Sequence, residues 1–356
     1  MNKNTITPIF QTILAAILFG ASAPISKLFL GEIEPIPLAA FLYLGSGVGL
    51  FVYQIFQRRN PEEDNEAPLQ RSDLAWLAGA ILAGGVIAPI ILLFGLQYTP
   101  GATASLLLNF EGVATTLIAA LVFKEAVSQQ AWWAILIITT ASILLSVSPT
   151  ENWGISLGAI GVLAACVFWG IDNNFTRNIS AKNPVSIVMV KGFAAGSFSL
   201  ILAMILGHPI PGVQIIIKAM ILGSLSYGLS ITLFIRAMRG LGAARTSALF
   251  GTAPLTGVVL SFLILQESAN TKFIIALPLM VAGAFLLVYE NHDHNHVHKD
   301  IVHEHWHEHE EEHHHHAHEE DAFAQSHSHK HRHEYHEHSH HHMPDIHHRH
   351  THPSEG

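Results

Sequence analysis

The chain contains a single cysteine, Cys166, in 356 residues. An internal disulfide and a thiolate cage for zinc are therefore excluded. Charged residues make up only 13% of the sequence, whereas soluble domains contain about 25%. The sequence has no glycine-rich phosphate loop ending in Lys-Ser or Lys-Thr and no basic cluster suited to phosphates. We therefore expect neither an ATPase nor a nucleic-acid-binding protein. We also expect no enzyme activity, and hence no catalytic residues and no obligatory cofactor.

Histidine is also scarce in the first 290 residues, which contain only His208, whereas residues 291–356 contain the other 26. Charge is divided in the same way. Residues 1–290 carry 14 Lys/Arg and 13 Asp/Glu, and residues 291–356 carry 4 and 14. The formal net charge of −9 therefore belongs to the end of the chain. The sequence divides into an apolar body and a polar, acidic tail rich in histidine.

The apolar body contains ten long hydrophobic runs. A bilayer core about 30 Å thick is crossed by about 20 residues of α-helix. Lipid offers no hydrogen-bond partner to an open backbone, so each run is predicted to be helical. The pattern predicts an all-α membrane protein with spans at 8–29, 35–56, 73–96, 101–123, 129–148, 154–178, 184–206, 214–237, 243–265 and 271–290.

The first run also resembles a secretory signal peptide, because Lys3 precedes it and Ala21-Ser22-Ala23 lies near its end. Pro24 follows at once, however, and the run has a counterpart later in the chain. We therefore expect it to remain as the first span.

Lysine and arginine predict the orientation in the membrane. With the N-terminus inside, the inner loops hold nine of these residues and the outer loops three. Ten spans then place both termini in the cytoplasm, and we expect the plasma (inner) membrane. An error of one helix in this count would move the histidine-rich tail to the outside.

The two halves of the body resemble each other. Residues 14–20 (LAAILFG) in span one match residues 164–170 (AACVFWG) in span six. Shifting 102–145 by 142 residues onto 244–287 aligns several small residues and superimposes Glu125 on Glu267. Five spans per copy is an odd number, so the second copy must be inverted in the membrane, which is an architecture of transporters. The alternative is chance similarity among apolar helices. We predict copies at 1–150 and 151–290, followed by the tail at 291–356.

These features resemble the EamA-type transporters of the drug/metabolite transporter superfamily. The resemblance rests on ten duplicated spans, on the aromatic-glycine pairs Phe19-Gly20 and Trp169-Gly170, and on Glu125 and Glu267 at the ends of spans four and nine. It covers about residues 8–290 and implies a ten-helix bundle around a central cavity that moves small organic solutes, mostly outward. The tail has no place in that pattern. We expect turn or capping roles for the two glutamates.

Ionisable groups at membrane depth are costly and are functional candidates by default. Glu111, near the middle of span four, can exchange a proton, ligate a metal or pair with an ammonium group. Alternatively, it serves only as a structural partner for Lys191 or a backbone group. Asp172 in span six faces the cavity if that span lines it, as the resemblance implies, or else lies near the cytoplasmic end and is hydrated. Lys191 lies about two turns into span seven and can snorkel to the inner interface.

Three further residues are candidates for the substrate cavity. Asn109 precedes Glu111 and would add an oxygen ligand or a hydrogen bond there. Trp169 and Phe19 are predicted to pack or to form cavity walls rather than to bind a particular solute.

The tail has the composition of a metal binder. Neutral imidazole suits zinc, nickel, cobalt and copper, and the interleaved carboxylates add charge. Such a composition cannot build a packed core, so we expect disorder and several weak, exchanging sites. The alternative is a pH-responsive or drifting low-complexity tail. The predicted metal ligands are His292, His294, His296, His298, His303, His305, His307, His309, His313, His314, His315 and His316.

The sequence therefore predicts a secondary transporter that exports small metabolites, such as amino acids, by alternating access, with proton exchange or facilitated flow. Its expected partners are the lipid bilayer, the solute, divalent metal ions on the tail, and a second copy of the chain if it forms an oligomer. One alternative is an exporter of nickel, cobalt or zinc collected by the tail. Another is a membrane-tethered metal store or sensor that transports nothing.

Overall fold

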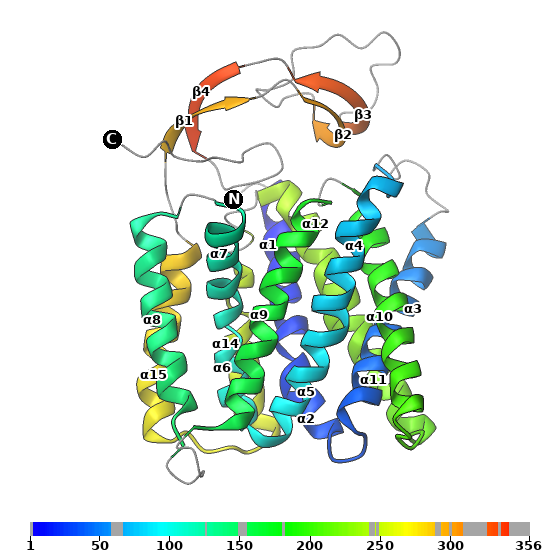
Figure 1. The fold of residues 1–356 in the computed structure, drawn as a ribbon, viewed down its shortest axis with the longest axis vertical. Helices are drawn as coiled ribbons and strands as arrows, with labels where there is room; N and C mark the ends of the chain where they lie inside the picture. Colours follow the sequence, from blue (N-terminus) through cyan, green and yellow to red (C-terminus); the bar gives the residue numbers. More distant parts are fainter. Residues whose placement is uncertain are drawn as a thin grey trace.

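The computed structural model describes residues 3–57, 67–124, 127–148, 155–179, 182–241, 246 and 249–288, together with the backbone of 293–298, 301–308, 326–333 and 336–341. The described body is a bundle of antiparallel helices (Figure 1). Its first half consists of α1 (Lys3–Gly20), α2 (Ser22–Phe29), α3 (Pro35–Gln57), η2 (Arg71–Asp73), α4 (Leu74–Ala80), η3 (Ile81–Ile87), α5 (Ala88–Tyr98), α6 (Gly101–Leu107), α7 (Phe110–Val122) and α8 (Gln129–Ser146). Its second half consists of α9 (Leu157–Arg177), α10 (Pro184–Ile205), α11 (Val213–Gly223), η4 (Ser224–Leu229), α12 (Ser230–Leu241), α14 (Ala253–Ile264) and α15 (Thr271–Val288).

Eight of the ten predicted membrane spans are confirmed. Among the described residues, eight helical stretches are long and apolar enough to cross a bilayer, and Ala253–Ile264 and Thr271–Leu287 are shorter apolar helices at the remaining two predicted places. The boundaries agree closely. For example, the run predicted at 35–56 is the stretch Pro35–Phe56. The chain is a multi-pass membrane protein.

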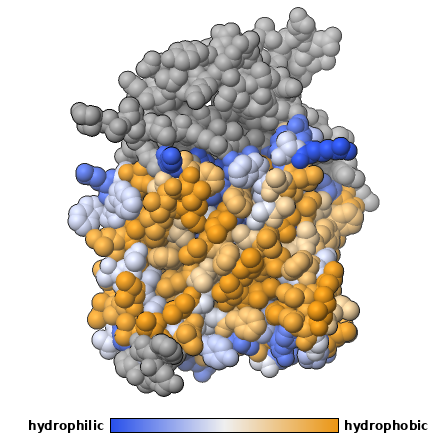
Figure 2. Space-filling model, viewed as in Figure 1, coloured by the Kyte–Doolittle hydropathy of each residue, from blue (hydrophilic) through white to orange (hydrophobic). Residues whose placement is uncertain are grey.

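The surface of the bundle is suited to lipid. On the face drawn in Figure 2, apolar residues cover the middle of the bundle and hydrophilic residues lie toward its two ends. Large apolar side chains of the described helices are freely exposed, including Leu121 at 73%, Ile205 at 75% and Leu263 at 70%. A soluble monomer rarely exposes a continuous apolar surface of this kind, because water penalises it.

Small residues bring helices close together inside the bundle. α3 and α10 pack along their lengths, and a Cβ added to Gly192 of α10 would lie 2.6 Å from the backbone nitrogen of Gly47 in α3. Contacts this close allow dispersion forces to hold helices together where the surrounding lipid is as apolar as the side chains.

The duplication is visible in the backbone. The π-helical segments η3 and η4 interrupt spans three and eight, and they begin 143 residues apart. Spans four and nine are both broken by turns, at 108–109 and at 251–252. Both spans also end in a residue with positive φ, Lys124 at 56° and Gln266 at 52°. Each of these lies directly before the glutamate that the sequence comparison aligned. Irregularities that recur at equivalent positions favour a true repeat over chance similarity.

Glu267 joins the two copies by capping a helix of the other half. Its Oε1 accepts a hydrogen bond from Gly101 N at 2.6 Å, and its Oε2 accepts one from Ala102 N at 2.8 Å. These amides are the free donors at the start of α6, where the helix dipole also favours an anion. The capping role predicted for Glu267 is confirmed, whereas Glu125 lies outside the described residues.

The described segments of the tail form two antiparallel strand pairs beyond the end of the bundle where α1 begins (Figure 1). β1 (Asp293–His298) pairs with β4 (His336–His341), and β2 (Ile301–Glu308) pairs with β3 (Ser326–His333). The disorder expected of the tail as a whole stays a prediction. Alternating residues have the period of a strand, which composition alone does not reveal. Of the predicted ligands, His292, His309 and His313–His316 lie outside the described residues.

We predict that Glu267→Ala lowers the free energy of unfolding by about 2 kcal/mol, because two charge-assisted hydrogen bonds to α6 are lost. The thermal unfolding midpoint of the detergent-solubilised protein should fall, and Glu267→Gln should lie between the variant and the wild type. Glu32→Ala, at an exposed position, is the matched control. Equal midpoints for Glu267→Ala and Glu32→Ala would contradict the capping role.

Candidate functional site

The carbonyl of Gly84 is a meeting point of three spans. Gly84 lies in η3, and its oxygen accepts hydrogen bonds from the Tyr43 hydroxyl at 2.7 Å and from the Trp169 Nε1–H at 3.1 Å. A π-helical turn departs from the regular α-helical ladder, which leaves carbonyls available to side chains, and such turns often lie at functional sites. The polar ends of two buried aromatic residues are thereby satisfied inside the bundle.

Asp172 and Lys191 form an ion pair beside this point. Asp172 of α9 is 4% exposed, and its Oδ2 contacts the Nζ of Lys191 in α10. The Thr176 hydroxyl donates to Asp172 Oδ1 at 3.0 Å. The alternative of a hydrated Asp172 is wrong, because the carboxylate is buried. The expectation that Lys191 snorkels to the interface is also wrong, because its ammonium group lies on Asp172.

Glu111 lies next to the ion pair and has a different partner. Its Oε1 accepts a hydrogen bond from Asn173 Nδ2 at 2.9 Å, and the same amide donates to Thr115 Oγ1 at 3.1 Å. Glu111 is partly buried and Asn173 is exposed, so the carboxylate lies at the edge of the packed interior. Glu111 interacts electrostatically with both Asp172 and Lys191. Lys191 pairs with Asp172, so the structural role suggested for Glu111 as its partner is wrong.

A row of aromatic rings leads to the same region. The ring of Phe19 in α1 lies 6.1 Å from that of Tyr227 in η4 and 5.4 Å from that of Phe250. Tyr227 stacks on Tyr43 with ring centroids 5.5 Å apart. Tyr43 shares the Gly84 carbonyl with Trp169. The rings therefore connect α1 and η4 of the two copies with the helix that carries Asp172.

Asn109 takes a local position. Its side-chain amide donates to the Leu106 carbonyl at 2.9 Å, in the turn between α6 and α7. Its amide thus satisfies a carbonyl at the end of α6. Asn109 therefore lies at the break in span four, two residues before Glu111.

Sequence reasoning missed several participants, among them Tyr43, Gly84, Thr115 and Asn173. A signal existed for Asn173, which adjoins Asp172, and for Tyr43, whose hydroxyl lies inside a long apolar run. Gly84 acts through its backbone carbonyl, and Thr115 acts through a hydrogen bond between helices. Neither contact can be predicted from the sequence pattern.

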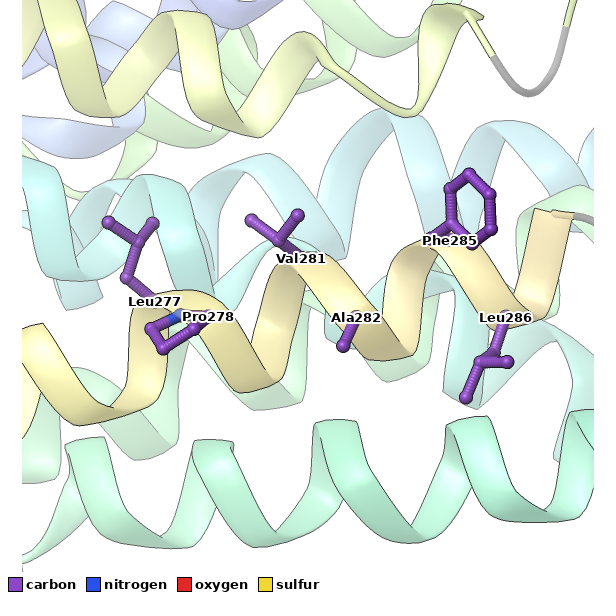
Figure 3. A pocket seen from close by; sticks show the side chains of 6 residues that line it. All are labelled: Leu277, Pro278, Val281, Ala282, Phe285 and Leu286. Atoms are coloured by element: carbon purple, nitrogen blue, oxygen red, sulfur yellow. The ribbon is translucent and has the colours of Figure 1, made fainter.

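An apolar groove runs along the outer face of α15 (Figure 3). It is lined by Leu277, Pro278, Val281, Ala282, Phe285 and Leu286. Val281 and Phe285 are largely exposed, so the groove belongs to the lipid-facing surface and matches an acyl chain better than a polar solute. Among the residues whose side chains the structure describes, no three His, Cys, Asp or Glu residues come together as a metal site.

Comparisons with known proteins agree with this architecture. The model of the EamA-like transporter family matches residues 6–147 and, separately, 156–289. An uncharacterized transporter from Methanothermobacter thermautotrophicus is 29% identical over 294 residues, which cover 78% of this chain and 85% of that protein. A solved crystal structure that is 18% identical covers 78% of this chain and 94% of its own, with a TM-score of 0.55. This last likeness concerns the fold alone.

We predict that Asp172→Asn costs about 3–5 kcal/mol of stability, because it leaves the Lys191 ammonium unpaired inside the bundle. The double variant Asp172→Asn/Lys191→Met should recover most of this loss, since it removes both charges. Thermal unfolding midpoints of the wild type, both single variants and the double variant measure the coupling. Additive losses would show that the pair does not stabilise the bundle as a unit.

We predict that Gly84→Ala destabilises the protein by about 1–3 kcal/mol, because a Cβ there would lie 1.9 Å from Asp172 Oδ2. The matched control is Gly212→Ala, since an added Cβ at Gly212 has no neighbour within 4 Å among the described residues. The unfolding midpoint should fall for the first variant only. An equal midpoint for the two variants would contradict the close packing of Gly84 on Asp172.

Proposed function

The chain belongs to the EamA-like transporter family, and we propose that it exports small organic solutes carrying an ammonium group, such as amino acids, in exchange for protons. The family makes the protein a membrane transporter of small solutes. The solute class, the direction and the coupling are our proposals, and the carboxylate of Glu111 beside a pair that already neutralises itself is the observation that supports them.

The charges near Glu111 favour exchange. Asp172 and Lys191 cancel, so an ionised Glu111 leaves one negative charge in a poorly solvated region. Such a charge is costly unless it is compensated. A proton on Glu111 removes the charge, and the ammonium group of a solute balances it. The site is stable with either ligand and unstable with neither, which couples release of one to binding of the other.

The aromatic row favours an organic cation over a bare one. Aromatic faces attract ammonium groups through the ring quadrupole, and they also cover the apolar part of a metabolite. Phe19 and Tyr227 come from different copies of the repeat. A solute that lies against this row of rings would contact both halves, as alternating access between inverted repeats requires.

The direction of export depends on the expected orientation, with both termini in the cytoplasm. In that arrangement the start of α1 and the tail strands lie on the cytoplasmic side, and α7 reaches from the break at 108–109 toward the same side. A proton entering from outside would displace the solute from Glu111 as the halves move. The broken spans four and nine provide the segments that can shift.

A divalent metal ion as cargo remains the second candidate, because the tail is so rich in histidine. The ion pair argues against it, since Lys191 already neutralises Asp172 and the single negative charge of Glu111 balances an ammonium group but not a divalent ion. A metal store that transports nothing is the third. In that case Glu111 would have no effect on any solute.

We predict that Glu111→Gln abolishes proton-coupled transport and leaves the fold intact, because glutamine keeps the shape and the bond from Asn173 but cannot exchange a proton. The measurement uses proteoliposomes that contain a pH-sensitive dye. The twenty amino acids, putrescine, acetate, and Zn²⁺, Ni²⁺ and Co²⁺ are added one at a time.

Proton flux should follow an ammonium-bearing solute in the wild type and in the control Glu32→Gln, and should be absent in Glu111→Gln. Flux driven by acetate or by metal ions alone, or equal flux in both variants, would overturn the proposal. Metal-driven flux that Glu111→Gln abolishes would establish the second candidate. If no added solute moves protons, total metal in cells with and without the tail tests the third.

A further inference from the structure

Spans three and four meet at a sharp corner of the chain. Only Thr99 and Pro100 separate the end of α5 from the start of α6. The corner lies at the end of the bundle away from the start of α1 (Figure 1). Span three carries the Gly84 carbonyl, and span four carries Glu111. Because both spans continue from this corner, its position affects both helices of the candidate site.

Lys27 of the first copy binds the α5 side of the corner. It lies in the last turn of α2, and its Nζ donates to the Leu96 carbonyl at 2.7 Å and to the Thr99 carbonyl at 2.6 Å. These carbonyls belong to the end of α5, where backbone acceptors have no partner within the helix and the helix dipole favours a cation. Lys27 therefore ties the end of α5 to α2.

Glu267 of the second copy binds the α6 side of the same corner. Its carboxylate accepts hydrogen bonds from the amides of Gly101 and Ala102, and it also interacts electrostatically with Lys27. The corner is thus bound on its carbonyls by a cation of one copy and on its amides by an anion of the other. We refer to Lys27, Glu267 and the backbone of 96–102 as the corner clamp.

The copies pack closely at the corner clamp. A Cβ added to Gly101 would lie 2.6 Å from Leu265 Cδ1 and 2.9 Å from Ser261 Oγ, and both of these residues belong to the second copy. Ser105 lies one turn further along α6 and is 1% exposed. Its hydroxyl has no hydrogen-bond partner among the described residues. The interface behind the clamp is therefore buried from this end of the bundle.

We propose that the corner clamp is a gate of the transporter, which is closed in this structure and breaks when this end of the bundle opens to solvent. Its hydrogen bonds are made by charged and backbone groups, and water can replace them when the clamp opens. The contact can therefore separate and form again, as a gate must. The proposal rests on the role of the chain as a transporter and on neither the solute nor the exchanged proton.

The inverted repeat provides a second base for the other end of the bundle. When residues 14–20 are placed on 164–170, Lys27 aligns with Arg177. Arg177 ends α9, on the side of the bundle where α1 begins (Figure 1). Alternating access requires the two ends to open in turn. Equivalent bases at opposite ends of the bundle suit this requirement.

The test measures how fast a cysteine behind the clamp reacts with a charged thiol reagent. The full-length protein is reconstituted in lipid nanodiscs, so that both ends of the bundle face solvent. Cys166→Ser removes the native thiol, and Ser105→Cys introduces the reporter. Lys27→Met breaks the α5 side of the clamp, and Glu267→Ala breaks the α6 side. No solute is added, so the result does not depend on the proposed exchange.

A matched control removes a comparable bond away from the corner. Lys272 of α15 donates to the Val147 carbonyl at the end of α8, at 2.5 Å. This bond also joins the two copies, but its helices carry none of the candidate site residues. Lys272→Met therefore removes a lysine-to-carbonyl bond without touching the clamp.

Labelling of the Ser105→Cys reporter should be slow with the intact clamp and about tenfold or more faster with either clamp variant, since each variant loses charge-assisted hydrogen bonds that favour the closed state. Lys272→Met should leave the rate unchanged. Unchanged rates in the clamp variants, or an equal increase with Lys272→Met, would overturn the proposal.

A second reporter separates the opening of a gate from a general loosening of the fold. Ser199 is 1% exposed and lies in α10, which packs along α3 and not on the corner. Ser199→Cys, in the same Cys166→Ser background, should be labelled slowly in every variant. If the clamp variants speed the labelling of both reporters equally, the clamp only stabilises the fold and the proposal fails.

Discussion

The cost of an uncompensated charge inside an apolar bundle is the constraint on which this structure depends. Asp172 and Lys191 meet that cost by pairing with each other, and the pair is supported by Thr176. Glu111 accepts a hydrogen bond from Asn173, and under the proposed function its charge is balanced by a proton or by the ammonium group of a solute. A transporter can use this imbalance, because a site that requires one of two ligands exchanges them naturally.

Interrupted helices are the second element of the design. A regular membrane helix satisfies all its interior backbone groups and offers none to side chains or solutes. The turn at 108–109 and the π segment that contains Gly84 both break this rule near the charged residues. Gly84 also has no side chain, which lets Asp172 approach η3 closely. The π-helical backbone of η3, the missing side chain of Gly84 and the buried charge of Asp172 therefore occur together. Each depends on the others.

The two copies of the repeat share the same backbone framework, but they differ in the residues near the charged site. The π segments, the broken spans and the positive-φ residues recur in both copies. When the two π segments are aligned on their first residues, Gly84 and Tyr227 occupy equivalent positions. The position that provides a backbone acceptor in one copy therefore provides an aromatic ring in the other. Glu267 ties the copies together at the start of α6. Under the proposed function, this symmetric framework with an asymmetric centre would bind one solute while its two halves rock.

The sequence by itself determined most of the spans, the fold class and the duplication, because hydrophobic length and repeated residue patterns are local properties of the chain. It also identified Glu111, Asp172 and Lys191 as candidates, since a charge in an apolar run is visible without coordinates. Only the tertiary structure decided that Lys191 pairs with Asp172 rather than with Glu111. That choice depends on which faces of different helices meet. The register of the tail strands likewise depends on pairing between distant segments, which composition does not encode.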